Sequence, residues 1–223
     1  MKNSIINSNP NLPFAGLYKT KFETAMSSNL HIPLSLKLPE ILFITTIPPR
    51  QCGIATYSQD LIKALENKFK GSFKIKICAL ESNNEQKNYD DQVQYKLNTD
   101  DKSAYENLTQ KIKDNSNIKM VLLQHEFGLF RNSEEELIEF LTNINKPVII
   151  GFHTVLPNAN DAFKAHLNSI IKKVHSIIVM TNAAAKILNE EYGVSKDRIA
   201  VIPHGTHLVP HTDQDVLNEK YGF

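Results

Sequence analysis

From Glu40 onward, hydrophobic residues recur in two alternating patterns, which predict strands and helices in turn. Short apolar runs predict strands at 41–46, 73–80, around 93–95, and at 118–124, 147–152, 176–181 and 199–202. Apolar residues three and four positions apart predict helices at 54–69, 101–115, 134–144, 161–175 and 182–192. The run at 118–124 is almost continuously apolar, which is typical of a strand covered on both faces.

The ends of several predicted helices carry recognisable cap residues. Gly71 and Gly193 follow two of the helices, where a left-handed C-terminal cap is expected. Ser133 precedes the helix at 134–144, and Glu136 three residues later predicts a capping box. Asn182 is expected to cap the last helix. The polar stretch 81–92 is expected to be a surface loop.

Alternation of strands and helices at these lengths predicts right-handed crossovers and a parallel sheet. We therefore expect an α/β fold, an open Rossmann-like parallel sheet of six or seven strands flanked by helices. Residues 1–37 are rich in Asn, Ser and Pro, and we interpret them as a flexible N-terminal extension. Their weak charge favours disorder over contact with a membrane surface. The Rossmann-like domain is expected to cover 38–206.

Composition excludes several classes of function. The net charge of +1 provides no field for binding nucleic acid or an anionic bilayer. No segment approaches the roughly 18 consecutive apolar residues that span a membrane. Cys52 and Cys78 have neither metal nor redox spacing, which favours a reducing, cytoplasmic location. Cys52 is either a nucleophile or a small filler beside Gly53, and the lack of a nucleophile signature around it favours the filler.

The most informative segment is 41–57, where an apolar strand runs through a Pro/Gly turn into an amphipathic helix. The free N–H groups of such a helix start, here at Gly53 and Ile54, suit an anionic group such as a phosphate. Arg50 lies in the same turn; it is one of only three arginines, and arginine binds phosphate well. Because Gly53 stands alone, the motif is neither a P-loop nor a dinucleotide fingerprint, which argues against a dinucleotide oxidoreductase.

Four segments that follow predicted strands combine polar groups with Gly or Pro: 48–53, 124–128, 153–157 and 203–205. In a parallel sheet all four lie on one rim, where ligands bind. Candidate binding residues there include His125, Glu126, His153, His204 and Gly205. His153 is placed to hydrogen-bond a sugar hydroxyl or a phosphate; the alternative for both His125 and His153 is a bond to a nearby loop carbonyl.

A metal site is not expected. The histidines at 204, 207 and 211 invite a zinc interpretation, but their spacing matches no standard motif. We therefore predict neither a metal nor another cofactor.

With these segments in this order, residues 40–223 resemble the N-terminal half of GT-B glycosyltransferases, in particular the retaining enzymes of family 4. The resemblance is carried by residues 48–57, 123–128, 152–154 and 201–205. Many relatives have Pro-Asn-Gly where this chain has Pro203-His204-Gly205, which suggests a distinct, mannosyltransferase-like branch.

The resemblance implies two Rossmann-like domains that face each other across a cleft. The N-terminal domain would hold a carbohydrate acceptor. Gly53 and the helix start would approach the diphosphate of a nucleotide-sugar donor, either GDP-mannose or a UDP-sugar. His153 would contact the transferred sugar. The second domain would bind most of the donor and carry paired glutamates. Residues 207–223 would begin the linker to that domain, which the chain lacks, so we expect the chain alone to be inactive. A non-catalytic module that binds a glycan or a partner, and a nucleotide-sugar epimerase-like domain, remain alternatives.

Overall fold

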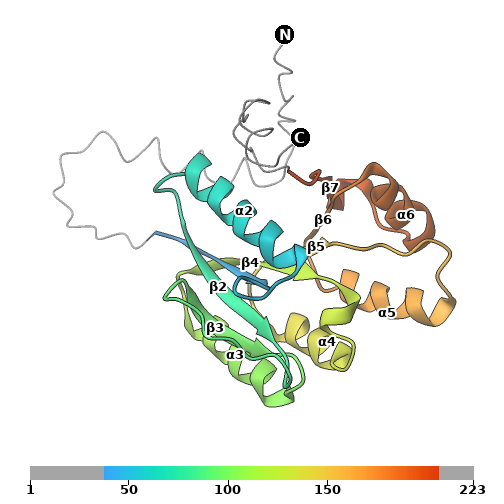
Figure 1. Cartoon of the computed structure of the whole chain (residues 1–223). Helices are drawn as coiled ribbons and strands as arrows, with labels where there is room; N and C mark the ends of the chain where they lie inside the picture. The colour runs from blue at the N-terminus through green and yellow to red at the C-terminus, as the bar shows by residue number, and fades with distance from the viewer. Residues whose placement is uncertain (1–37, 206–223) are drawn as a thin grey trace, which may run out of the picture. The chain divides into compact units, whose positions relative to one another are not determined.

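Seven parallel strands form one sheet in the order β3-β2-β1-β4-β5-β6-β7 (Figure 1). The computed structural model describes residues 38–205. The strands are β1 (Glu40–Thr45), β2 (Lys74–Glu81), β3 (Val93–Asn98), β4 (Ile118–His125), β5 (Val148–Phe152), β6 (Ser176–Val179) and β7 (Ile199–Val201). The predicted α/β, Rossmann-like class is confirmed, and each predicted strand is present.

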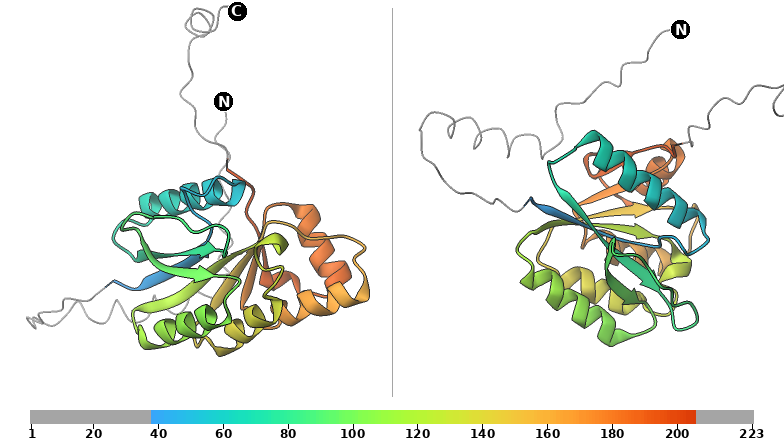
Figure 2. Two further views of the ribbon diagram at one scale, coloured as in Figure 1. Left: turned by 60° about the horizontal axis from the view of Figure 1, so that its bottom comes forward. Right: turned by 60° about the vertical axis from the view of Figure 1, so that its left-hand side comes forward.

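Five α-helices connect the strands and cover the sheet. They are α2 (Gly53–Lys68), α3 (Lys102–Asp114), α4 (Glu134–Asn143), α5 (Asp161–Ile171) and α6 (Asn182–Tyr192). Short 3₁₀ turns lie at η2 (Phe127–Leu129) and η3 (Lys196–Arg198). Helix α2 lies over one face of the sheet, whereas α3, α4 and α5 lie over the other (Figure 2). Among residues 38–205 no helix has the length and apolar character needed to cross a bilayer.

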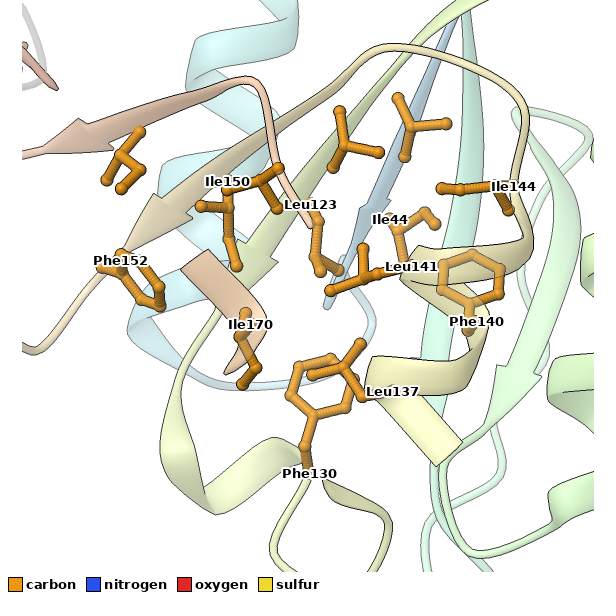
Figure 3. Close-up of a cluster of buried hydrophobic side chains, with 14 of the residues drawn as sticks. Ile44, Leu123, Phe130, Leu137, Phe140, Leu141, Ile144, Ile150, Phe152 and Ile170 are labelled. Carbon is orange, nitrogen blue, oxygen red and sulfur yellow. The ribbon is translucent and has the colours of Figure 1, made fainter. Parts of the chain in front are cut away.

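The core consists of two layers because alternate strand residues face opposite sides of the sheet. Under α2, Phe43 and Leu122 pack with Ile62 in the smaller layer. On the other face the larger layer joins the strands to α3, α4, α5 and α6. Figure 3 shows part of the larger layer, in which strand residues meet Leu137 and Phe140 of α4. With both faces covered, the central strands are apolar on both sides, as expected of a parallel sheet.

Three of the four predicted caps need correction or refinement. Ser133 occupies the N-cap of α4 but makes no side-chain capping bond; its hydroxyl is 2.8 Å from the buried hydroxyl of Tyr105 instead. The last helix is capped by Thr181 rather than Asn182, since Thr181 Oγ1 accepts a hydrogen bond from the Ala184 N–H at 3.0 Å. The C-cap of α2 is Phe69 rather than Gly71, which lies two residues further on with a positive φ of 74°.

The C-cap prediction at Gly193 is confirmed, with a left-handed φ of 69°. The predicted extension at 1–37, the linker at 207–223, and the histidines at 207 and 211 lie outside the described residues.

Candidate functional site

The strand order reverses between β1 and β4: the chain continues from β1 to β2 on one side and from β4 to β5 on the other. Ligands of open α/β sheets bind beyond the carboxyl ends of the strands at such a switch point. Several predicted segments do meet there. The His153 N–H donates to the His125 carbonyl at 3.1 Å, and the rings of His153 and His204 are 6.1 Å apart.

Helix α2 begins at this switch point without a side-chain cap. Its first intrahelical bond runs from the Thr56 N–H to the Cys52 carbonyl. The N–H groups of Gly53, Ile54 and Ala55 therefore have no partner within the helix. A Cβ atom added to Gly53 would meet nothing within 4 Å, so there is open space beside the first residue of the helix. The helix start is thus able to accept an anion.

Buried polar contacts fix this helix start to β1. Thr45 Oγ1 lies 2.6 Å from Ser58 Oγ, and both residues are fully buried. Thr46 Oγ1 lies 3.3 Å from Cys52 Sγ, so the half-buried thiol fills the turn beside Gly53. These contacts hold the first turn of α2 over the end of β1.

Three rings gather next to the helix start. The Tyr57 ring makes edge contacts with His153, at a centroid distance of 5.1 Å, and with His204, at 4.8 Å. The sequence predicted His153 and His204 as site residues, whereas Tyr57 is one of the apolar positions, three and four apart, that predict the helix at 54–69. Tyr57 has the spacing of a core residue, and nothing else in the sequence distinguishes it.

A groove of about 790 Å³ lies between α2 and the segment after β7. The residues that line it are Gly53, Thr56, Tyr57, Asp60, Leu61, Ala64, Ile202, Pro203, His204 and Gly205. The groove thus begins at the uncapped helix start and contains two of the three clustered rings. Its walls join the predicted candidates Gly53, His204 and Gly205.

His153 is half-buried, and its Nε2 lies 2.7 Å from Gln124 Oε1. Burial, with a smaller contribution from the neighbouring His204, lowers the pKa of His153 to about 4, although Glu126 opposes the shift. The imidazole is therefore neutral at physiological pH. It can form hydrogen bonds but provides no positive charge.

Glu126 holds two loops together. Its Oε1 accepts a hydrogen bond from the Phe127 N–H at 3.0 Å, and its Oε2 accepts one from the Thr154 hydroxyl at 2.7 Å. Because both oxygens are engaged, the observed geometry favours a structural role for Glu126 over the predicted contact with substrate.

His125 departs from its predicted role more clearly. It is 2% exposed and packed among the rings of Phe127, Phe130 and Phe152. Its Nδ1 is buried without a hydrogen-bond partner in the described part of the chain. Burial, with smaller contributions from the nearby His166 and His153, lowers the pKa of His125 to about 3. Neither a substrate contact nor a bond to a loop carbonyl describes this side chain, which belongs to the core.

The position of Arg50 also differs from the one expected. Its guanidinium forms an ion pair with Glu85 at 3.1 Å, in the loop after β2. It lines a separate hollow with residues at the end of β2 and in the segments after β3 and β4, including Glu81 and Arg131. The structure therefore does not bring Arg50 into the groove that contains Gly53.

The described residues contain no group of three or more His, Cys, Asp or Glu side chains arranged to hold a metal ion. Gly53 also lacks the neighbouring glycines, two and three positions apart in the same turn, that a dinucleotide fingerprint requires. Among the described residues, the rim presents the helix start and two imidazoles beside the groove.

Comparison with known proteins agrees with this architecture. The structure is similar to the crystal structure of a glycosyltransferase from Rickettsia africae ESF-5, with a TM-score of 0.55 and 16% sequence identity. The match covers 83% of this chain and 50% of that one, so the chain corresponds to about half of that protein. A comparison with curated proteins finds no significant match. At this low identity, the structural match shows the fold alone.

The sequence itself gives the family. The family model for Glycosyltransferase Family 4 matches residues 52–209, which begin at the N-cap of α2 and include the whole rim from Gly53 to Gly205. Since this match spans more than half of the 223 residues, the chain belongs to glycosyltransferase family 4.

Proposed function

We propose that this domain forms the acceptor side of a glycosyltransferase that moves a sugar from a nucleotide-sugar donor, GDP-mannose or a UDP-sugar, to a glycan or another acceptor with retention. The observation that carries the proposal is the uncapped start of α2 at the switch point, beside the half-buried His153. In a nucleotide-sugar donor the diphosphate is bonded directly to the transferred sugar. The start of α2 can bind the diphosphate, and the neighbouring His153 can form a hydrogen bond with the sugar.

The helix start supplies electrostatic stabilisation. When the bond between the sugar and the diphosphate breaks, negative charge accumulates on the leaving phosphate. The N–H groups of Gly53, Ile54 and Ala55 are fixed in place by the polar contacts under α2. Donors held in place in advance stabilise developing charge without reorganisation.

His153 supplies orientation. Because its pKa lies near 4, it is neutral when the sugar binds and acts as a hydrogen-bonding group rather than as a cation. Its contacts with Gln124 and Tyr57 restrict the imidazole. Holding the sugar in one orientation lowers the entropic part of the barrier. Glu126 accepts one hydrogen bond at each oxygen and so holds the segment that carries His153 and Thr154 in place.

The groove between α2 and 202–205 offers space for the acceptor. At about 790 Å³ it has the size of a typical small-molecule site. In a two-domain enzyme of this fold the donor is held mainly by the facing domain. We therefore propose that the 223-residue chain alone binds nucleotide diphosphates weakly and transfers sugar negligibly.

Calorimetric titration of the chain with GDP, UDP, guanosine and uridine tests the proposal. We expect the diphosphates to bind more tightly than the nucleosides, because the phosphates contact the helix start. Equal binding of nucleoside and diphosphate would contradict the role of α2. Rapid sugar transfer by the chain alone would contradict the proposed division between two domains. A chain that binds glycans but binds neither GDP nor UDP would instead indicate a non-catalytic module.

A further inference from the structure

Gln124 is a buried polar residue next to the proposed site, and the mechanism above does not explain it. It lies one residue before the end of β4 and is 1% exposed. Leu122, two residues earlier, belongs to the core layer under α2, so Gln124 faces the same side of the sheet. On that side its Oε1 lies 2.7 Å from Nε2 of His153.

Because Gly151 has no side chain, the Gln124 side chain can occupy the space next to it. Gly151 pairs with Gln124 in the register between β4 and β5. A Cβ atom at position 151 would lie only 2.7 Å from Gln124 Oε1 and 3.3 Å from its Cδ, which is too close for an unstrained contact. Any larger residue there would therefore displace the carboxamide from His153.

The same contact determines which end of the carboxamide meets His153. The Gln124 oxygen is the carboxamide atom closest to the position of a Cβ on Gly151, at 2.7 Å against 3.5 Å for the nitrogen. A Cα hydrogen of Gly151 points in that direction, and a C–H group attracts an oxygen and repels an N–H group. The oxygen thus faces His153, and a carboxamide oxygen only accepts hydrogen bonds.

We infer that Gln124 is a positioning residue that holds His153 in the tautomer with its proton on Nε2, so that Nδ1 is left to accept a hydrogen bond from a sugar hydroxyl. The tautomer of His153 is inferred from the Gln124–His153 contact alone. The hydrogen bond between Nδ1 and a sugar hydroxyl also rests on the proposed function. The neutral tautomers of histidine carry one donor and one acceptor nitrogen. With Nε2 donating to Gln124, the imidazole has no N–H for a phosphate oxygen.

The surroundings of the imidazole agree with a neutral acceptor. Within residues 38–205, Nδ1 of His153 has no hydrogen-bond partner. The charges of His204 and Glu126 act on the ring in opposite directions, and burial outweighs both. Two further titratable side chains lie near the ring, Tyr57, whose burial raises its pKa, and His125, whose burial lowers its pKa. His153 therefore discriminates between hydroxyl and phosphate groups, and the anion site is left to the start of α2.

Nitrogen-15 NMR of the imidazole tests the tautomer in the chain without ligand. Near pH 7 the two ring nitrogens of a single tautomer resonate far apart. We expect the wild-type spectrum to show the proton of His153 on Nε2. In Gln124→Met, which keeps the length of the side chain but removes the acceptor, and in Gly151→Ala, which displaces it, we expect this preference to be lost. Gln124→Glu, which returns an acceptor oxygen, should restore it and raise the pKa of His153 above about 4.

Gln94→Met is the matched control, because Gln94 is another strand glutamine, whose Oε1 accepts from the Ile77 N–H at 3.0 Å. It should leave the His153 signals unchanged. A wild-type spectrum with the proton on Nδ1, or Gln124→Met and Gly151→Ala variants that fold and keep the wild-type signals, would overturn the inference. Having two variants at different positions guards against the failure of one of them to fold.

Binding measurements separate this inference from the proposed function. The contribution of the sugar is the ratio of the affinity for GDP-mannose to that for GDP, or of the affinity for UDP-glucose to that for UDP. We expect Gln124→Met to reduce this ratio by about tenfold and to leave the affinity for GDP or UDP unchanged. If the sugar adds no affinity in the wild type although the tautomer is as inferred, the donor role fails while the positioning of His153 by Gln124 stands. A loss of GDP or UDP affinity in Gln124→Met would contradict the separation of hydroxyl and phosphate sites.

Discussion

The Thr154 hydroxyl donates to Glu126 Oε2 at 2.7 Å, which joins the segment after β4 to the segment after β5. The His153 N–H, which donates to the His125 carbonyl, extends the sheet pairing to the same point. Two hydrogen bonds, one from the His153 N–H and one from the side chain of the next residue, therefore join the two segments at this point. This arrangement explains how an imidazole beyond the last strand residue can keep one orientation.

The Thr154–Glu126 bond can be tested by removing only the hydroxyl. Thr154→Val keeps the shape of the side chain and should lower the free energy of unfolding by about 1 to 2 kcal/mol, since a bond to a charged group is lost. Thr154→Ser keeps the hydroxyl and should lower it less. Urea unfolding followed by circular dichroism measures both. Equal losses in the two variants would show that the methyl group, rather than the hydrogen bond, matters.

The two histidines with lowered pKa values predict acid sensitivity. The unfolded chain binds a proton on each histidine below about pH 6.5, whereas the folded chain resists doing so until about pH 4 at His153 and about pH 3 at His125. The unfolded state thus binds more protons in this window, so the free energy of unfolding is highest above pH 6.5 and falls as the pH is lowered. For the buried His125 the slope is about 1 kcal/mol per pH unit.

His125→Phe isolates this contribution. A phenyl ring fits among Phe127, Phe130 and Phe152 and removes the unpaired Nδ1. We expect the variant to be at least as stable as the wild type at pH 7 and to lose less stability between pH 6.5 and pH 4. His175→Phe, at a histidine whose Nδ1 accepts from the Val148 N–H at 3.2 Å, is a control that removes a satisfied imidazole. An unchanged pH slope in His125→Phe would contradict the burial argument.

The anion site at α2 can be blocked by a carboxylate. The space beside Gly53 is open, so Gly53→Asp places a negative charge at the helix start without a steric conflict. We expect it to stabilise the helix by about 0.5 to 1 kcal/mol and to weaken GDP or UDP binding at least about tenfold. Gly53→Ala adds a side chain without charge and should retain most of the binding. Titration calorimetry measures the affinities, and equal effects of the two variants would point to sterics rather than charge.

The Tyr57 ring is expected to control the protonation of His153. Burial is the main cause of the lowered pKa of His153, and the Tyr57 ring is 5.1 Å away. Tyr57→Ala should therefore raise the pKa of His153 from about 4 towards its ordinary value, whereas Tyr57→Phe should leave it nearly unchanged. NMR titration of the imidazole carbon-bound protons gives both values. A pKa near 4 in Tyr57→Ala would show that other groups bury His153.

Periodicity was sufficient to predict the strands, the helices and the rim on which Gly53, His153 and His204 meet, because regular spacing reflects which faces are buried. The orientation of His125 was not predictable, since strands apolar on both faces do not reveal which side a polar residue takes. The pairing of Arg50 with Glu85 depends on the fold of a surface loop. Gln124 lies in the segment 124–128 that the sequence singled out, but its contact with His153 was not predictable, because that contact depends on the clearance at Gly151 in the neighbouring strand.

The bond between Tyr105 and Ser133 has a consequence for how the domain opens. The N-cap residue of α4 is bound to a side chain in the first turn of α3, and the Tyr105 ring also contacts Phe140 near the end of α4. Neither helix can separate from the other without breaking the hydrogen bond between these buried hydroxyls. The two helices should therefore detach as one cooperative unit, with amide hydrogens that exchange with solvent at similar free energies of opening.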